Sequence, residues 1–349
     1  MSEAVSEFEE VTRQALLGWG FCNAMVAPLG TGLVNRTFLV EHANKNFVLQ
    51  QVNAIFDPRI HENIHAVTNL LARAGLTTLE LVPTLDGRLW SESAGVWRMY
   101  RHIDGVSFDT ATSGAQVRSA GRLVGTFHAV LEPAALEFVG ARLGVHHTER
   151  HLASLQRALV AHEGHRLMND VRPLAEELVL AAGRLPSLPE LALRPGHGDL
   201  KLSNVLFERT EPSRALCLVD LDTVGPIHLA HELGDMWRSW CNRATEDDAE
   251  AKLDLDIMRE SWLGYCEGLG RSLTADERES ALLGIEWISL ELSVRFAADA
   301  LNEAYFGWNS VKFASLGDHN LRRARGQWSL HRAVCRTRQE RRSLLDSTG

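Results

Sequence analysis

The sequence predicts an α+β protein of two unequal lobes, and two features of its 349 residues lead to this prediction. Short apolar runs bounded by turn-forming residues, which are typical of strands, are concentrated in residues 1–103. From Ser107 onward, apolar residues recur mostly at helical spacing. We therefore expect a small N-terminal lobe, 1–103, with an antiparallel sheet, and a larger, mainly helical C-terminal lobe, 104–349.

The N-terminal lobe is predicted to contain two helices and several short strands. The first helix carries an apolar stripe that stops near Gly18 and Gly20, and the second stops at Gly75. A glycine-rich turn at 30–32 separates the first two strands. The predicted elements are helices at 1–20 and 60–74, two strands within 28–40, and strands at 46–52, 80–84 and 96–101.

The C-terminal lobe is predicted to consist of helices on either side of a loop-rich segment. Prolines at 186, 189 and 195 interrupt the helical pattern, and the apolar run 216–219 indicates a short buried strand. The predicted helices cover 116–131, 151–163, 171–185, 249–268, 275–301 and 316–345.

The most informative segment is 197–204, His-Gly-Asp-Leu-Lys-Leu-Ser-Asn, which Asp220 follows after sixteen residues. Asp199 and Asn204 can point a carboxylate and an amide from one tight loop toward one place, and the strand before Asp220 would bring a second carboxylate there. A carboxylate that aims an acceptor hydroxyl, with oxygen ligands for Mg²⁺, is what phosphoryl transfer requires of a protein. His-Gly-Asp alone is a common turn sequence. The full set matches the H-x-D-x-x-x-x-N loop of kinases and the metal-binding aspartate that follows it.

Two parts of the N-terminal lobe are candidates for nucleotide binding. Glycines at 30 and 32 would let backbone N–H groups approach phosphate oxygens closely, although an ordinary hairpin turn is the alternative interpretation of a lone Gly-x-Gly. The segment from Tyr100 to Asp104 would be a hinge whose backbone groups bind the edge of an adenine. Together with the catalytic loop, these features predict ATP and Mg²⁺ as cofactors.

Composition and charge argue against several classes of protein. A net charge of −9 and a pI near 5.9 do not suit nucleic-acid binding. No apolar run approaches the length of a membrane span, and the acidic N-terminus does not resemble a secretory signal. The five cysteines include no Cys-x-x-Cys pair, which is typical of reduced thiols. We therefore expect a cytoplasmic protein that acts on a small molecule and binds neither nucleic acid nor membrane.

These motifs resemble the aminoglycoside-phosphotransferase and choline-kinase branch of the protein-kinase-like fold, and they are most similar to bacterial N-acetylhexosamine 1-kinases. The resemblance extends over nearly the whole chain and implies a bilobal fold. Its catalytic loop is specific for the superfamily, and its C-terminal segments are specific for the sugar-kinase branch. Besides the catalytic loop, the resemblance rests on segments 30–35, 47–53, 96–100, 219–223, 233–235, 295–299 and 319–321.

The resemblance implies roles for four residues of the catalytic region. Asp199 would orient or deprotonate the acceptor hydroxyl. Lys201 would reach the γ-phosphate, with a solvated loop lysine as the alternative. Asn204 and Asp220 would hold Mg²⁺.

The resemblance also implies contacts with the acceptor, support for the loop and a nucleotide site. Asp222, Arg295 and Tyr305 would contact a sugar, and a second metal is the alternative partner of Asp222. His197 and Asp235 would support the catalytic loop, Asp235 through hydrogen bonds to its backbone. The implied nucleotide-binding residues are Gly30, Thr31, Gly32, Asn35, Gln50, Met99, Tyr100 and His102.

One position departs from the kinase pattern. Kinases carry a lysine on the third strand that pairs with the α and β phosphates, whereas the corresponding segment here ends in Gln50. The similar sugar kinases share this feature, so it does not imply inactivity. Neutralisation of the phosphates would then depend on Mg²⁺, the glycine-rich backbone and Lys201.

Three functions remain open: a small-molecule kinase, a protein kinase, and a pseudokinase that binds a nucleotide or sugar without turnover. Fifteen residues separate Asp220 from Asp235, too few for the activation segment that seats a peptide. The pseudokinase hypothesis rests on the missing strand lysine, and the presence of Asp199, Asn204 and Asp220 argues against it. By resemblance, the acceptor would be the anomeric hydroxyl of an N-acetylhexosamine. An aminoglycoside, or another sugar or amino alcohol, is the alternative acceptor.

Overall fold

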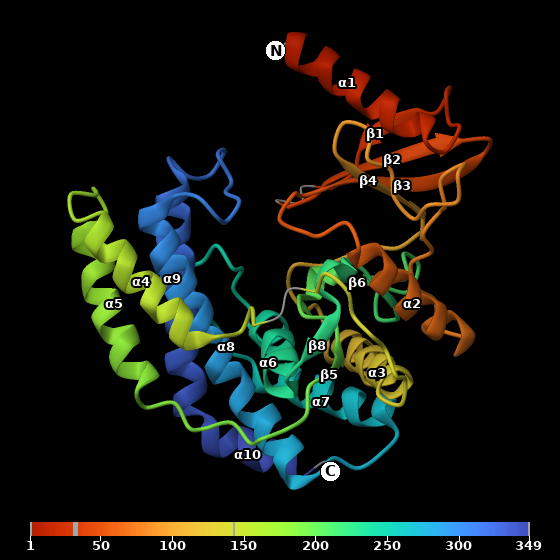
Figure 1. The fold of residues 1–349 in the computed structure, drawn as a ribbon. Coiled ribbons are helices and arrows are strands. Elements are labelled where there is room, and N and C mark those ends of the chain that lie inside the picture. Colours follow the sequence, from red (N-terminus) through yellow and green to blue (C-terminus); the bar gives the residue numbers. More distant parts are fainter. Residues whose placement is uncertain (1, 31–33, 142–143, 348–349) are drawn as a thin grey trace. The chain divides into compact units, whose positions relative to one another are not determined.

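The chain forms two compact units (Figure 1). The computed structural model describes residues 2–30, 34–141 and 144–347. The N-terminal unit comprises residues 1–104 and 135–142, and the C-terminal unit comprises residues 105–134 and 143–349. A small antiparallel sheet in one unit and a larger helical body in the other confirm the predicted α+β class. Among the described residues, no helix has the length and apolar character needed to cross a membrane.

The N-terminal unit is built on one antiparallel sheet. Its elements are helices α1 (Ser2–Leu17) and α2 (Ile60–Arg73) and strands β1 (Met25–Pro28), β2 (Arg36–His42), β3 (Lys45–Val52) and β4 (Val96–Arg101), with strand order β1-β2-β3-β4. Phe38, Leu49 and Met99 pair across neighbouring strands and are buried in one cluster with Leu16 of α1. This burial fixes the register, because a slip of one residue would turn these side chains to the other face.

The segment 80–84, which the sequence predicts as a strand, does not form one. Leu81 makes only an isolated bridge to β4, and the Val82 N–H donates to the Met99 carbonyl at 2.8 Å. Pro83 has no N–H to donate, so the pairing does not continue.

The C-terminal unit is mainly helical, in agreement with the sequence. Its helices are α3 (Gly114–Leu131), α4 (Thr148–Ala161), α5 (Met168–Ala182), α6 (Leu229–Trp240), α7 (Leu255–Leu269), α8 (Ala275–Asn302), α9 (Leu316–Arg336) and α10 (Arg338–Asp346). Helix α8 packs against α4, α5, α6 and α9 (Figure 1). Thr274 and Glu277 form a capping box at its start, so two N-terminal backbone N–H groups of α8 have partners.

Several helix boundaries differ from the prediction, and α6 was not predicted. Helix α7 begins at Leu255 rather than at residue 249, because the Asp254 side chain accepts hydrogen bonds from two N–H groups of its first turn. The single helix predicted over 316–345 is divided at Thr337 into α9 and α10.

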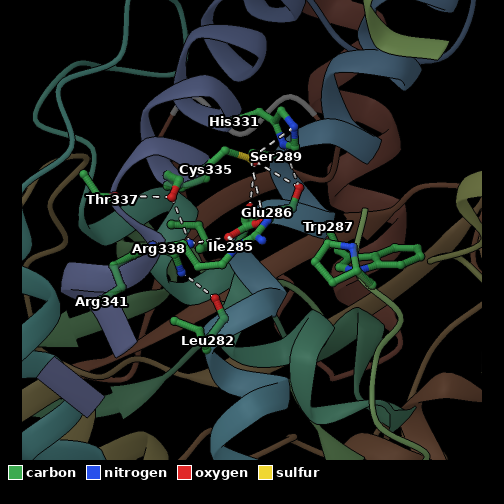
Figure 2. Close-up of polar contacts among 12 residues, drawn as sticks. Leu282, Ile285, Glu286, Trp287, Ser289, His331, Cys335, Thr337, Arg338 and Arg341 are labelled. Carbon is green, nitrogen blue, oxygen red and sulfur yellow. Dashed lines mark hydrogen bonds and ion pairs between the residues drawn. The ribbon is translucent and has the colours of Figure 1, made fainter. Parts of the chain in front are cut away.

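A buried ion-pair cluster fastens α10 to α8 (Figure 2). Glu286 of α8 is fully buried and accepts hydrogen bonds from Arg338, whose Nε lies at 2.8 Å, and from Arg341. Arg341 also donates to the carbonyls of Leu282 and Val334. A buried charge needs such partners, because an isolated one costs several kcal/mol. Arg338 and Arg341 lie three residues apart on α10, so both can meet one carboxylate.

Helices α3 and α7 cross with their backbones in contact. Gly121 and Gly125 of α3 lie against α7, and Gly264 and Gly268 of α7 lie against α3, and a Cβ on any of the four would overlap backbone atoms of the other helix. A similar glycine contact joins α6 to α8. This second contact holds α6, which carries side chains of the candidate site, against α8.

We expect Gly264→Ala to lower the free energy of unfolding by about 1–3 kcal/mol, because the added methyl would overlap the Arg118 carbonyl. The gain in helix propensity, about 1 kcal/mol, offsets only part of this cost. Urea denaturation would measure the change beside the control Gly164→Ala, where a Cβ meets nothing within 4 Å. Equal stability of the two variants would contradict the expectation.

Candidate functional site

Two nested antiparallel strand pairs hold the predicted catalytic loop. The outer pair is β5 (Arg194–Gly196) with β8 (Gly225–Ile227), and the inner pair is β6 (Val205–Phe207) with β7 (Ala215–Leu218). This nesting brings the connection 197–204 against the connection 219–224, although they are distant in the sequence.

Hydrogen bonds join the two connections. The Val219 N–H donates to the Asn204 carbonyl at 2.9 Å, and Nε2 of buried His197 donates to the Val219 carbonyl at 2.9 Å. The Thr223 hydroxyl donates to the His197 carbonyl at 2.8 Å. Gly198 has φ of 82°, and a Cβ there would lie 2.7 Å from the Thr223 carbonyl oxygen, so this close approach requires glycine.

The Asp199 carboxylate contacts the two polar side chains of its own loop. Lys201 Nζ lies 3.0 Å from Asp199 Oδ2, and Asn204 Nδ2 donates to the same oxygen at 3.1 Å and to the Asp199 carbonyl at 2.8 Å. Because Nδ2 is bound to Asp199, the Asn204 amide has its acceptor oxygen left for another ligand. The side chains of Asp199 and Lys201 remain 29% and 37% exposed, so a ligand can reach them.

Asp220 adopts a left-handed backbone conformation, with φ of 62° and ψ of 53°. This conformation is uncommon outside glycine and costs on the order of 1 kcal/mol or more, so it depends on the joined connections around it. The negative charge of Asp220 is one of the causes that raise the pKa of Lys201. Asn204 Oδ1 and the Asp220 carboxylate are hard oxygen donors of the type that Mg²⁺ prefers, so this donor set fits a magnesium ion.

The charges of the loop alter its pKa values. Burial is the largest single influence on Asp199 and would raise its pKa, but the charge and hydrogen bond of Lys201 outweigh burial and hold the pKa below its ordinary value. The charge of Asp199 is also the main cause of the raised pKa of Lys201. Asp199 is therefore an anion at neutral pH, able to accept a hydrogen bond or a proton from a hydroxyl.

Glu232 of α6 supports the catalytic loop, a role that the sequence analysis missed. Its two carboxylate oxygens accept the N–H groups of His197 at 2.7 Å and Gly198 at 2.9 Å. Glu232 is 1% exposed and also contacts Nε2 of His128 at 3.1 Å, whose Nδ1 lies 3.0 Å from the Tyr265 hydroxyl. One buried carboxylate thus satisfies two backbone donors that would otherwise be unpaired.

Asp235 does not form the backbone hydrogen bonds that the sequence predicts, and that expectation is wrong. Asp235 Oδ1 accepts from Arg238 Nε on the same helix at 2.9 Å, and in the described part of the chain Oδ2 has no hydrogen-bond partner. Burial raises the pKa of Asp235 in spite of Arg238, and the charge of Asp199 adds to the rise. Glu232 and Asp235 lie three residues apart on one helix face, and the fold brings Glu232 to the loop backbone.

Arg295 and Tyr305, two of the predicted sugar contacts, belong to a second cluster at the C-terminal end of α8. The Arg295 guanidinium lies 5.9 Å from the centroid of the Tyr305 ring and 5.4 Å from that of Phe306, which the sequence analysis did not single out. Glu291, one turn earlier, lies 3.9 Å from Arg295 Nη1. Arg295 is largely buried, whereas Tyr305 is 49% exposed. Asp222, the third predicted contact, is buried in the short turn before β8.

Two buried carboxylates hold this second cluster. Glu291 Oε1 accepts a hydrogen bond from Nδ1 of His146 at 3.0 Å. Asp299 accepts the consecutive N–H groups of residues 304–306 at 3.1, 3.0 and 2.8 Å, and Nδ2 of Asn320 at 2.9 Å. Three backbone donors on one carboxylate fix the segment that carries both aromatic rings.

The predicted phosphate-binding turn lies in the N-terminal unit. Thr31 and Gly32 lie outside the described residues. Gly30 has φ of 75° and open space around its Cβ position. Asn35 is buried and accepts the Asn53 N–H at 2.9 Å, so it ties the end of the turn to the end of β3.

The predicted adenine-binding hinge is partly engaged within the same unit. The Met99 side chain lies in the apolar cluster under α1, and its carbonyl accepts the Val82 N–H. The His102 N–H donates to the Asn46 carbonyl at 3.1 Å. The His102 N–H, one of the donors that the sequence offers to an adenine, therefore already has a partner in the sheet.

Comparison with known proteins gives the same fold. The structure of a microcompartment-associated aminopropanol kinase is 17% identical, with a TM-score of 0.63 over 95% of this chain and 98% of that chain. A spectinomycin phosphotransferase solved with ADP and spectinomycin is 11% identical, with a TM-score of 0.58 over 93% and 98%. A choline kinase from Streptococcus pneumoniae is 13% identical, with a TM-score of 0.57 over 91% and 97%. These likenesses confirm the kinase-like fold class that the sequence predicts.

The sequence itself matches a known family over most of its length. The family described as "Phosphotransferase enzyme family" matches residues 26–265, which is more than half of the chain. This match includes the loop of Asp199 and Asn204 and the strand that leads to Asp220. The chain therefore belongs to the phosphotransferase enzyme family.

Proposed function

We propose that this phosphotransferase is a kinase that transfers the γ-phosphoryl group of ATP to the anomeric hydroxyl of an N-acetylhexosamine. The observation that carries the proposal is the junction of two distant connections around Asp199. There Asp199 is in direct contact with Lys201 and Asn204, and the charge of Asp220 contributes to the raised pKa of Lys201.

The residues of this junction suit the steps of phosphoryl transfer. The acceptor hydroxyl donates to Asp199, its oxygen bonds to the γ-phosphorus, and the bond from that phosphorus to the β–γ bridging oxygen breaks as ADP leaves. The hydroxyl proton passes to Asp199. Asn204 Nδ2 holds the carboxylate of Asp199 in place, and Lys201 offers a cation to the oxygens of the transferred group.

Magnesium, when bound, neutralises charge on the phosphates. Asn204 and Asp220 would hold it through their side-chain oxygens. The hydrogen bonds from Asn204 Nδ2 to Asp199 decide which end of the amide is presented.

The cluster of Arg295 supports a neutral acceptor. Aromatic faces attract ammonium groups, but the rings of Tyr305 and Phe306 have the protein's own guanidinium beside them. A cationic acceptor placed here would be repelled by Arg295. Hydroxyl and acetamido oxygens of a neutral sugar can instead accept hydrogen bonds from it.

An aminoglycoside or amino-alcohol O-phosphotransferase is the second candidate function. Two observations favour it. Similar structures carry the names of an aminopropanol kinase, a spectinomycin phosphotransferase and a choline kinase. The net charge of −9 also suits attraction of a cationic acceptor.

A panel of acceptors tests the proposal. ADP release would be measured with N-acetylglucosamine, N-acetylgalactosamine, glucose, spectinomycin, choline and 1-amino-2-propanol, and phosphorus NMR would identify a sugar 1-phosphate by coupling to the anomeric proton. We expect an N-acetylhexosamine to have the highest kcat/KM. Preference for a cationic acceptor would select the second candidate, and ATP binding without ADP release on any acceptor would indicate a pseudokinase.

We expect Arg295→Gln to raise KM for the sugar by about tenfold or more, because a hydrogen bond to a charged group is lost. The change in KM for ATP should be much smaller. The matched control is Arg332→Gln, because Arg332 lies 5.7 Å from the ring of Trp328 on an exposed part of α9. Equal changes in KM for sugar and ATP would mean that Arg295 supports the scaffold only.

A further inference from the structure

A row of three polar side chains crosses the sheet of the N-terminal unit. Thr37 of β2, Gln50 of β3 and Arg98 of β4 are direct cross-strand partners. Gln50 Nε2 donates to the Thr37 hydroxyl at 3.0 Å, and Arg98 Nε donates to Gln50 Oε1 at 2.9 Å. Both ends of the Gln50 amide thus form hydrogen bonds, and Oε1 orients the guanidinium of Arg98.

The row lies on the face of the sheet opposite α1. Successive side chains of a strand point to opposite faces. The neighbouring row of Phe38, Leu49 and Met99 packs in the cluster with α1, so the polar row points the other way. A lysine at the position of Gln50, as in other kinases, would project from this polar face.

Arg98 is the cation of this row. Its residue is fully buried, and its guanidinium lies 5.2 Å from the centroid of the Tyr100 ring as well as against Gln50. A guanidinium can bind phosphate through two parallel N–H donors, which a lysine cannot do.

We propose that Arg98 carries the positive charge that binds the nucleotide phosphates in this chain, in place of the strand lysine that Gln50 replaces. Gln50 is a positioning residue that holds the guanidinium of Arg98. Compared with the usual strand lysine, the positive charge would lie on β4 instead of β3, on the same face of the sheet. This inference rests on the proposed function only in that ATP is the phosphoryl donor.

Calorimetric titration of the full chain with ADP and with adenosine tests this inference, because neither titration needs an acceptor. We expect Arg98→Gln to raise the Kd for ADP by about tenfold or more, as loss of a charged hydrogen bond implies, with a much smaller change for adenosine. The double variant Gln50→Lys with Arg98→Gln returns a cation to the usual strand position and should recover most of the affinity for ADP. The control Arg88→Gln removes an exposed arginine of the same unit, paired with Asp86, and should leave both affinities unchanged.

Unchanged ADP affinity in a folded Arg98→Gln, or equal losses for ADP and adenosine, would overturn the proposal. If Arg98→Gln does not fold, Gln50→Met provides the test, since it keeps the charge and removes the hydrogen bond that orients it. Gln50→Met should weaken the binding of ADP several-fold more than the binding of adenosine. Equal losses of affinity for the two ligands would overturn the proposal. A wild-type protein that binds no nucleotide would instead contradict the proposed function itself.

Discussion

Asp199→Asn is expected to reduce turnover by at least about a hundredfold, the usual contribution of a positioned general base. The amide cannot accept the hydroxyl proton, and it loses the charge that pairs with Lys201 at 3.0 Å. ATP affinity should change only a few-fold, because the carboxylate acts on the acceptor. Single-turnover kinetics with saturating ATP would separate the chemical step from nucleotide binding.

The matched control for this variant is Asp170→Asn. Asp170 also pairs with a cation, Arg325 at 2.6 Å, on the surface of the C-terminal unit. Its replacement should leave turnover unchanged. A mild loss of turnover in Asp199→Asn would mean that another group aims the acceptor.

The pH profile of kcat gives a second check on Asp199. The reaction requires the ionised carboxylate, and its pKa lies below the ordinary value because Lys201 outweighs burial. Activity should therefore be kept above that lowered pKa and lost as the pH falls through it. Lys201→Met removes the main cause of the lowering, so the acidic limb should move to higher pH.

Glu232→Ala is expected to have the largest effect on stability, about 3–5 kcal/mol, which is typical of breaking a buried charged network. The N–H groups of His197 and Gly198 would lose their acceptors inside the protein. Glu232→Gln keeps one acceptor oxygen and should cost about 1–3 kcal/mol, because one buried donor is left unpaired. Turnover should fall in both variants, since this backbone carries Asp199.

Urea denaturation measured against pH distinguishes this role from simple packing. Burial, the largest influence on Glu232, would raise its pKa, but hydrogen bonds and charges of His128 and His197 lower it below the ordinary value. The stabilisation should therefore be fully present above the unfolded pKa of about 4.5. It should decline as the pH falls through the lower folded pKa. The difference in the free energy of unfolding between wild type and Glu232→Gln should therefore become smaller as the pH falls over this range.

The control for Glu232 is Glu208→Gln. Glu208 pairs with the exposed Arg214 at 2.8 Å beside the inner strand pair. Exposed pairs contribute about 0–1 kcal/mol, so the control should stay near wild-type stability. A similar small loss in Glu232→Gln would show that the loop backbone does not depend on Glu232.

Local patterns were sufficient for most elements of the fold. Helix α8 begins at the predicted residue and ends one residue beyond the predicted end. A capping box marks its start, and its apolar pattern is continuous. The segment 80–84 was assigned wrongly because its apolar residues outweighed the missing N–H of Pro83. The break at Thr337 was missed because no glycine or proline lies near it to mark a helix end.

The sequence by itself determined the chemistry of the catalytic loop. Asp199, Lys201 and Asn204 lie within six consecutive residues, so their contacts are local and their spacing is visible in the sequence. Only the tertiary structure decided which distant groups support or complete this chemistry. Glu232 rather than Asp235 reaches the loop, and Arg98 lies across from Gln50, because helix crossings and strand register set these contacts. Both depend on the packing of whole elements, which no short stretch of sequence specifies.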